Sequence, residues 1–251
     1  MTNPKFDYLL RLADNALVLS QRLSEWCGKC PALEEDMALT NVALDLIGQA
    51  RFWFDYAAEI EAQGRDQDAL AFRRDAGDFR NALLVEQPNG SYADTLARQF
   101  FFDSWHYLLL QKLCTSTDER IAAVADKSLK EVAYHARRSA DLVVRLGDGT
   151  ERSHAMMQAA FDDLWAYTGE LFQADAVDVA MIDAGVAPDP HCLRAPWLEH
   201  VRSVFEEATL HMPAEDAWMH KGGKQGVHSE HLGYLLAEMQ FLQRAYPGAT
   251  W

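Results

Sequence analysis

The sequence has few cysteines, few glycines and prolines, and no long apolar run. Four cysteines in 251 residues are too few for the disulfide framework of a small secreted protein, so we expect free thiols. Fourteen glycines and eight prolines exclude a collagen-like or low-complexity chain. No stretch approaches the roughly 20 uncharged apolar residues of a membrane-spanning helix, and the N-terminus lacks the basic-then-apolar pattern of a signal peptide. We therefore expect a cytoplasmic protein with no membrane partner.

Basic residues are also scarce. The chain has 23 lysines and arginines against 38 acidic residues, which gives a formal net charge of −15 with histidine neutral. This balance argues against nucleic acid and anionic membranes as main partners. Hydrophobic residues make up 49% of the chain, which is more than a disordered protein contains. A packed globular fold is expected.

Apolar residues recur at steps of three and four along most of the chain, as in amphipathic helices. This spacing predicts four long helices, at residues 6–26, 34–63, 92–113 and 119–146. Short turns join the helices within each pair, and an ordered crossover at 65–90 joins the two pairs. That order is typical of the ferritin-like variant of the four-helix bundle.

Further helices are expected C-terminal to the bundle, at about 153–173, 195–211 and 229–245. The sequence has neither the alternating pattern of β-strands nor an internal repeat. We therefore predict an all-α fold, a ferritin-like four-helix bundle with additional C-terminal helices. We expect a single domain over residues 1–251, with the core bundle at about 6–146 and the additional helices at about 150–245.

The level at which such a bundle binds metal follows from its antiparallel geometry. In carboxylate-bridged di-iron bundles, two helices each give one carboxylate and two give Glu-x-x-His. The turn between the third and fourth helices centres near residue 117, so Asp103 and Glu131 lie 14 residues to either side, roughly 21 Å along the bundle. Asp45 lies 14 residues after the first turn, near residue 31. These three carboxylates are expected at one level.

The imidazole ligands are missing from this level. The Glu-x-x-His positions contain Asp45-x-x-Gly48 and Glu131-x-x-Tyr134. The first helix has apolar residues there, and its nearest polar residues are Asp14, Asn15 and Gln21. We predict neither a bound metal nor a catalytic residue in this chain. The positions of the degenerate metal site are Asp45, Gly48, Asp103, Glu131 and Tyr134.

Two interpretations of these polar residues stay open. Three carboxylates and one imidazole are enough for a surviving single-metal site, formed by Asp45, Asp103, His106 and Glu131. Alternatively, the carboxylates belong to a buried polar network with Gln49, Lys127, Tyr134 and His135. The network is favoured because ligation inside a bundle normally uses all of its helices.

Two short motifs are expected to have structural roles. Cys27-Gly28-Lys29-Cys30 has the spacing of a redox pair or of half a zinc site, but it follows a helix and lacks a second pair. We expect ordinary thiols at a turn. In His228-Ser229-Glu230-His231, we expect Ser229 to cap the last helix and the histidines to form hydrogen bonds at the surface or an interface.

Five segments carry a resemblance to a known family: LRLADNALVLSQRLSEWCG (10–28), LDLIGQAR (44–51), LLVEQPNGSYADTLARQFFFDSWH (83–106), KEVAYHARRS (130–139) and GGKQGVHSEHLGYLLAEMQFLQR (222–244). The chain resembles, over nearly its whole length, the C subunits of phenylacetyl-CoA 1,2-epoxidases, which are bacterial multicomponent monooxygenases. The resemblance implies a ferritin-like, non-catalytic subunit that binds no cofactor itself. It also implies a catalytic A subunit with the di-iron centre as partner, and a reductase that delivers electrons from NADPH.

The resemblance further implies contacts with the CoA thioester at two segments. One segment lies in the crossover and the other follows the predicted bundle. Arg80 is suited to a CoA phosphate, whereas the nearby Asp75 and Asp78 oppose an anion. The implied contact residues are Asp78, Phe79, Arg80, Asn81, Val179, Ala180 and Met181.

The expected function is therefore that of a structural subunit in aerobic phenylacetate degradation, which binds and stabilises the di-iron subunit. Two alternatives from other classes stay open. The first is an autonomous metal-dependent ferritin-like oxidase or oxygenase, which metal content and O2 uptake by the lone chain would reveal. The second is a homo-oligomeric helical scaffold or storage protein, which predicts a large cage without a heterologous partner.

Overall fold

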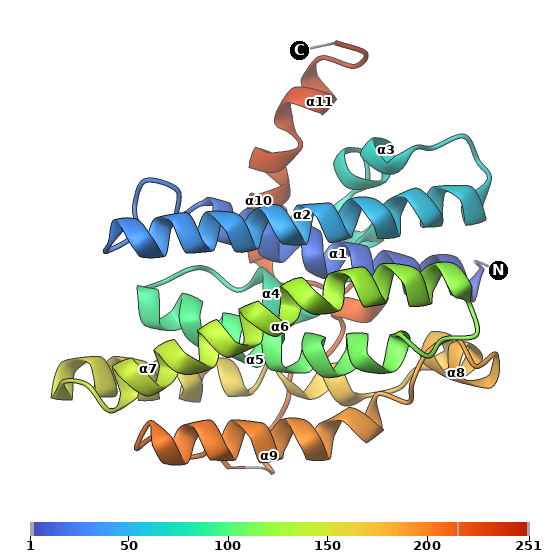
Figure 1. The fold of residues 1–251 in the computed structure, drawn as a ribbon. Helices are drawn as coiled ribbons and strands as arrows, with labels where there is room; N and C mark the ends of the chain where they lie inside the picture. The colour runs from blue at the N-terminus through green and yellow to red at the C-terminus, as the bar shows by residue number, and fades with distance from the viewer. Residues whose placement is uncertain (1–2, 215, 250–251) are drawn as a thin grey trace. The chain divides into compact units, whose positions relative to one another are not determined.

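The computed structural model describes residues 3–214 and 216–249. Within these residues the regular structure consists entirely of helices (Figure 1). The predicted all-α fold is confirmed, and the two pairs of long helices are consistent with a ferritin-like bundle. None of the described helices is long and apolar enough to cross a membrane.

The chain divides into two compact units. Unit 1 comprises the chain up to residue 88 together with the chain from residue 221 onward, and unit 2 comprises residues 89–220. The single domain expected over the whole chain stays a prediction.

Unit 1 is built on a pair of long helices, α1 (Pro4–Ser24) and α2 (Leu33–Glu61), which run side by side in Figure 1. Asn3 caps α1, because its side chain accepts a hydrogen bond from the Lys5 backbone N–H at 3.0 Å. α2 ends where Ala62 adopts the left-handed conformation, with φ at 55°. The two helices match the expected ranges to within two residues at each end.

The crossover of unit 1 is ordered, as expected. It contains α3 (Gln67–Phe72), the 3₁₀ turn η1 (Ala76–Asp78) and α4 (Leu83–Glu86). The C-terminal part of the chain then completes unit 1 with the 3₁₀ turn η3 (Gly223–Gln225), α10 (Glu230–Met239) and α11 (Phe241–Ala245). The single helix predicted at 229–245 is therefore broken at Gln240.

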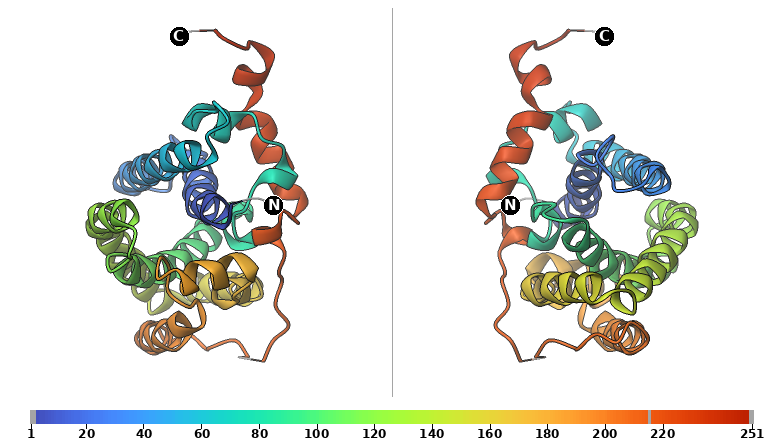
Figure 2. Two further views of the ribbon diagram at one scale, coloured as in Figure 1. Left: turned by 90° about the vertical axis from the view of Figure 1, so that its right-hand side faces the viewer. Right: turned by 90° about the vertical axis from the view of Figure 1, so that its left-hand side faces the viewer.

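Unit 2 contains the second pair of long helices, α5 (Tyr92–Leu113) and α6 (Glu119–Gly147), and the shorter elements that follow them. In Figure 2, α7 and α9 lie beside this pair. A capping box starts α5, in which Ser91 and Asp94 bond each other's backbone N–H groups. The later elements are α7 (Glu151–Trp165), η2 (Gly169–Phe172), α8 (Ala176–Asp183) and α9 (His191–Glu207).

The later helices of unit 2 differ from the prediction. α7 ends at Trp165, before the turn that leads into η2, so the helix expected at 153–173 is shorter. α8 was not predicted, and α9 begins at His191, four residues before the expected start at residue 195. Pro196 lies inside α9 as its sixth residue, where the missing N–H removes one intrahelical hydrogen bond.

Aromatic side chains fill the core of unit 2. The rings of Phe161 and Phe205 are 4.5 Å apart between centroids, and Phe101 lies 5.0 Å from Phe161. The indole N–H of Trp197 donates to the Phe101 backbone oxygen at 3.1 Å, so this buried polar group is satisfied. Such packing rigidly holds α5 against α7 and α9.

Candidate functional site

The polar level predicted from the sequence includes α5 in unit 2. Asp103 is buried there, and its Oδ1 accepts a hydrogen bond from the Gln99 side chain at 2.6 Å, one helical turn earlier. No described residue donates to Asp103 Oδ2. Burial raises the pKa of Asp103 to about 6, although His135 and the Gln99 hydrogen bond act in the opposite direction. Asp103 is therefore a buried carboxyl group with one hydrogen-bond partner, and burial favours its protonated form.

His106 lies one turn further along α5 and is also buried. Burial lowers its pKa to about 3, with a smaller contribution from His135, so the imidazole is neutral at pH 7. Its Nδ1 has no hydrogen-bond partner among the described residues. Its ring packs on Phe102 at a centroid distance of 5.1 Å. His106 is therefore a buried, neutral histidine of unit 2 whose Nδ1 makes no hydrogen bond to a described residue.

The α6 positions differ in exposure. Glu131 is half-buried, whereas 45% of Tyr134 is exposed. His135 of α6 acts on the pKa values of both Asp103 and His106; it is buried and has Tyr134 at 6.2 Å between ring centroids. Ser139 and Arg138 of α6 also lower the pKa of Asp103. His135 thus belongs to the buried polar group of α5 and α6.

The degenerate positions of α2 lie in unit 1. Asp45 is half-buried and interacts with another residue. Gly48 is half-buried, and nothing lies within 4 Å of the place where a Cβ atom would be. The position that holds an imidazole in the di-iron pattern is therefore occupied here by a residue without a side chain.

These residues do not fit a di-iron centre. A carboxylate-bridged centre needs four carboxylates and two imidazoles at one level, whereas the buried group on α5 and α6 has one carboxylate and two imidazoles. One oxygen of that carboxylate is already engaged by Gln99. Within residues 3–214 and 216–249, no group of three or more His, Cys, Asp and Glu side chains is arranged to hold a metal ion. We derive no reaction step through iron in this chain.

The crossover residues expected near CoA occupy different environments in unit 1. Phe79 and Asn81 are fully buried, Arg80 is half-buried and Asp78 is exposed. The Arg80 guanidinium donates to the backbone oxygens of Gly77 and Phe79, at 2.8 and 2.7 Å. Within this group, Arg80 is the cation nearest to solvent.

The second expected CoA segment falls on α8 of unit 2. Val179 is 49% exposed, Ala180 is half-buried and Met181 is buried. The helix starts with a capping box in which Asp175 and Asp178 bond each other's backbone N–H groups. The role of both segments toward CoA stays a prediction.

A buried carboxylate that the sequence analysis did not single out joins the crossover to the C-terminal segment. Glu86, at the end of α4, accepts hydrogen bonds from the Asn81 side chain at 3.0 Å and from the Ser229 backbone N–H at 2.6 Å. Its Oε2 also lies 2.9 Å from His228 Nδ1. We call Glu86, Asn81, His228 and Ser229 the Glu86 cluster.

The surroundings of His228 favour its protonated form. Its Nδ1 faces the Glu86 carboxylate and its Nε2 faces the Phe79 backbone oxygen at 3.0 Å, and both partners are acceptors. Burial alone lowers the pKa of His228, but the hydrogen bond and charge of Glu86 outweigh burial and raise it. Ser229 stands at the N-cap position of α10, as expected, but its side chain makes no capping bond.

A second buried ion pair fastens the crossover to α1. Arg74 donates to both oxygens of Asp14, with Nη1 at 3.0 Å from Oδ2, and the Arg80 backbone N–H donates to the same Oδ2 at 2.8 Å. Both charged side chains are almost fully buried. Asp14 was identified in the sequence only as a polar residue near the metal level. Its position in the middle of an apolar helix was the available signal that it has a buried partner.

The glycine-rich turn η3 is packed against the crossover at Gly226. This residue has a φ of 82°, and a Cβ atom there would lie 2.7 Å from Arg80 Nη1 and closer still to the Gly77 backbone oxygen. Only glycine fits, because it tolerates the left-handed region and leaves room for the neighbouring chain. The sequence Gly222-Gly223-Lys224-Gln225-Gly226 therefore serves chain packing in unit 1.

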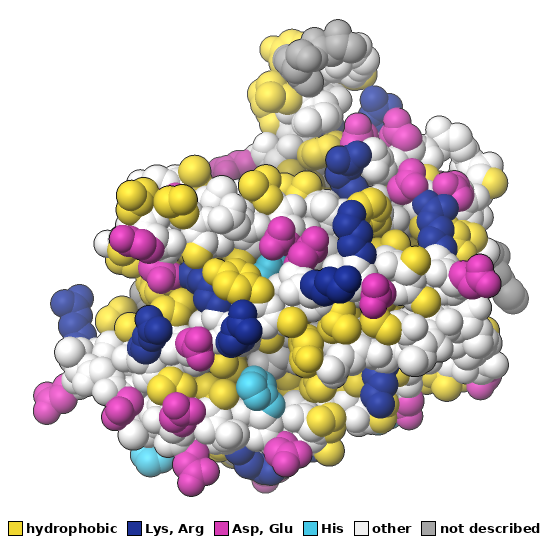
Figure 3. Space-filling model, in the orientation of Figure 1, with side chains coloured by type: hydrophobic (Ala, Val, Ile, Leu, Met, Phe, Trp, Pro, Cys, Tyr) yellow, Lys and Arg dark blue, Asp and Glu magenta, His cyan; other side chains and the backbone are white. Residues whose placement is uncertain are grey.

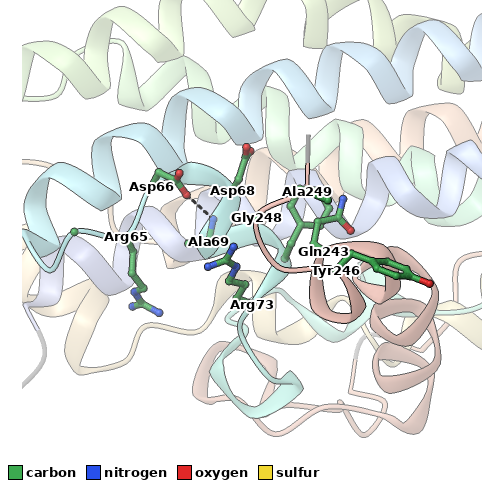
Figure 4. A pocket seen from close by; sticks show the side chains of 11 residues that line it. Arg65, Asp66, Asp68, Ala69, Arg73, Gln243, Tyr246, Gly248 and Ala249 are labelled. Atoms are coloured by element: carbon green, nitrogen blue, oxygen red, sulfur yellow. Dashed lines mark hydrogen bonds between the residues drawn. The ribbon is translucent and has the colours of Figure 1, made fainter. Parts of the chain in front are cut away.

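A cleft of about 440 Å³ lies in unit 1 beside α3 and the chain after α11 (Figure 4). Asp66 caps α3, since its Oδ1 accepts from the Ala69 N–H at 2.8 Å, and Arg65 is paired with Glu61. The charged lining residues are Arg65, Asp66, Asp68 and Arg73. Their charges balance, so the cleft does not select for an ion of one sign.

Comparison with known proteins shows the family of this chain. The family model described as "Phenylacetic acid catabolic protein" matches residues 1–251. A relative from Escherichia coli (strain K12), which is named as the C subunit of 1,2-phenylacetyl-CoA epoxidase, is 54% identical over 244 residues, which cover 97% of this chain and 98% of the relative. The resemblance stated from the sequence is therefore confirmed. The chain belongs to the phenylacetic acid catabolic protein family.

Proposed function

We propose that this chain is the structural, non-catalytic subunit of a phenylacetyl-CoA 1,2-epoxidase in phenylacetate degradation, and that it binds and stabilises the subunit that carries the di-iron centre. The observation that carries this proposal is the 54% identity to a relative named as the C subunit of such an enzyme, over almost the full length of both chains. A subunit role implies a complex of several chains.

The residues at the predicted metal level support a structural, non-catalytic role for this chain. Gly48 and Tyr134 stand where the di-iron pattern has imidazoles, and Asp103 is held by Gln99. We therefore assign no cofactor to this chain and no catalytic residue. The partner subunit holds the di-iron centre, and a reductase supplies electrons from NADPH.

The complex as a whole performs a monooxygenation. Phenylacetyl-CoA, O2, two electrons and two protons give the ring-1,2-epoxide and water. One oxygen atom enters the aromatic ring and the other leaves as water. This chain contributes to the reaction by shaping and stabilising the catalytic subunit, and the CoA thioester is positioned in the complex.

Contacts of this chain with CoA are part of the proposal. Arg80 is a half-buried cation of the crossover, and Val179 is the most exposed of the three α8 residues expected near CoA. Phe79, Asn81 and Met181 are buried, so they would act by holding these surface residues in place. Asp78 is exposed and disfavours a phosphate in its immediate vicinity.

Co-expression with the candidate catalytic subunit tests the proposed function. We expect the two chains to co-purify through a tag on either one, and we expect epoxidation of phenylacetyl-CoA to require both. Metal analysis should find iron with the catalytic subunit and not with this chain alone. The proposal fails if the chains do not co-purify and the catalytic subunit is equally soluble and active by itself.

The two alternatives have distinct outcomes in the same preparations. An autonomous oxidase would contain one or more iron or manganese ions per chain, lose them on Asp103→Ala, and consume O2 without a partner. A storage or scaffold protein would form a large homo-oligomer, which the mass measured by light scattering would show.

A further inference from the structure

α2 has a second apolar face, opposite the one that packs on α1. Leu33, Met37 and Leu44 are 72%, 60% and 60% exposed, and the half-buried Gly48 follows at the same spacing. Steps of four, seven and four residues place these four positions along one side of a helix. We call Leu33, Met37, Leu44 and Gly48 the α2 stripe. The buried residues of α2, such as Val42, Leu46 and Trp53, lie on the other side.

The stripe is concentrated rather than scattered. In Figure 3, hydrophobic side chains gather along the N-terminal half of α2. Isolated exposed apolar residues are normal on a protein surface, whereas a contiguous row on one helix marks an interaction site. Leu33, Met37 and Leu44 lie within twelve residues on one side of α2, with Thr40 and Asn41 between Met37 and Leu44 on the same side.

Gly48 gives the stripe a shape that suits a helix. Nothing lies within 4 Å of a Cβ atom placed there, so the surface has a depression one turn after Leu44. Helices pack when a side chain of one enters a hole between side chains of the other. The stripe offers such an open position at Gly48, one turn after the projecting side chain of Leu44. A flat or polar partner surface would neither fill the open position at Gly48 nor cover the projecting apolar side chains.

The charge of α2 indicates what kind of helix fits. α2 has seven acidic residues and a single arginine. Glu34 is exposed and Asp45 half-buried beside the stripe, and Asp36 lies on its other side. A second copy of this chain, docked through the same face, would bring two strongly acidic helices together, which is unfavourable. A helix with an apolar stripe flanked by lysine and arginine is complementary to both properties.

We propose that the α2 stripe is the docking surface for such a basic-flanked amphipathic helix of the di-iron subunit. This inference rests on the proposed function, because it takes the occupant from the complex named there. It adds the face of this chain that binds and the chemistry of the partner that is bound. Apolar burial supplies the affinity, and the acidic flanks supply orientation and rate of association.

Two substitutions test the stripe without damage to the fold. Gly48→Leu fills the hole, and it should fold because the position is open and leucine favours a helix more than glycine does. Leu44→Glu puts a charge in the centre of the apolar row at a side chain that is 60% exposed. Met156→Glu on α7, where 39% of the side chain is exposed, is the matched control.

Affinity for the purified catalytic subunit is the readout, measured by calorimetry or surface plasmon resonance. We expect Gly48→Leu and Leu44→Glu each to raise Kd at least tenfold, and Met156→Glu to leave it within twofold. Glu34→Lys should raise Kd about threefold at low salt and weaken its salt dependence. Circular dichroism and thermal unfolding of each variant alone should match the unsubstituted chain.

The outcomes separate the two proposals. If the unsubstituted chain binds the catalytic subunit and the stripe variants bind equally well, the docking surface is wrong while the proposed function stands. If the unsubstituted chain does not bind, both fall. If sedimentation shows that this chain dimerises alone and that Leu44→Glu abolishes the dimer, the occupant is a second copy, and the proposal is likewise overturned.

Discussion

The two units of this protein bury carboxylates in different ways. In unit 1, Glu86 accepts hydrogen bonds from Asn81 and the Ser229 backbone and faces His228. In unit 2, Asp103 has Gln99 on one oxygen, and no described residue donates to the other. Glu86 has three hydrogen-bonding partners at its two oxygens, whereas Asp103 has one, and His135, Ser139 and Arg138 offset only part of the effect of burial on its pKa. A buried charge that is fully partnered stabilises a fold, and one that is not lowers its stability.

The two groups also differ in the parts of the chain that they join. The Glu86 cluster joins parts of the chain 142 residues apart, together with the hydrogen bonds of Gln240 and Arg244 to the crossover backbone. The Asp103 group joins neighbouring turns of α5 with α6. Polar atoms without a partner among the described residues occur in both groups: Asp103 Oδ2 and His106 Nδ1 in unit 2, and Asn81 Oδ1 and Ser229 Oγ in unit 1.

The largest expected effect comes from breaking the Glu86 cluster. Glu86→Ala leaves a buried imidazolium, an amide and a backbone N–H without their acceptor. We expect a loss of about 3–5 kcal/mol in the free energy of unfolding, measured by urea denaturation. Limited proteolysis should cut the chain after residue 221 much faster than in the unsubstituted protein.

The control for this experiment is Glu238→Ala, which removes an exposed carboxylate from α10. It should change the free energy of unfolding by less than about 0.5 kcal/mol. Equal destabilisation by both variants would mean that the Glu86 cluster is not the tie described above.

An intermediate and pH-dependent effect is expected at Asp103. Its folded-state pKa of about 6 lies above the ordinary value of 3.8, so its contribution to stability is fully present below pH 3.8 and is lost as the pH rises through 6. Asn does not ionise, so the Asp103→Asn variant does not lose this stability as the pH rises. The free energy of unfolding of the variant, relative to the unsubstituted chain, should rise by about 3 kcal/mol between pH 3.5 and pH 8.

Denaturation curves at several pH values in this range measure that difference, and the contribution of His106 cancels because it is present in both proteins. Asp141→Asn, at an exposed position of α6, should give a difference that does not vary with pH. A pH-independent difference for Asp103→Asn would show that Asp103 ionises as it would in water.

The smallest effect is expected at the surface of unit 1. Arg244 forms an ion pair with Asp75 at 2.8 Å, but 82% of the Asp75 side chain is exposed. Water screens such pairs, so Asp75→Asn should cost less than about 1 kcal/mol, and 0.5 M salt should remove most of that cost. Thermal unfolding at two salt concentrations measures both. If Asp75→Asn lowered the free energy of unfolding as much as Glu86→Ala, buried and exposed ion pairs would not differ in their contribution to stability.

The long helices were predictable because their apolar period extends over many turns. α1, α2, α5 and α6 agree with the sequence-based ranges, since each has five or more turns with an apolar face. α8 has only eight residues and was missed. Its capping box, Asp175-x-x-Asp178, was the signal that would have located it.

The candidate site was predictable only in part. Asp103 and His106 are spaced to share one face of α5, so their proximity follows from the sequence. The contacts of Glu86 with His228 and of Asp14 with Arg74 span 142 and 60 residues, and no helical period indicates them. The burial that shifts the pKa values of Asp103 and His106 is likewise a property of the packed fold.

The discontinuity of unit 1 has a consequence for how the protein is made. Glu86 leaves the ribosome long before His228, and at about 5–20 residues per second the 142 intervening residues take roughly 7–30 s to synthesise. Unit 2, which is continuous in sequence, has all its residues available during that interval. The order of synthesis therefore lets unit 2 fold before unit 1, in which the Glu86 carboxylate stays exposed until the residues from 221 onward are made.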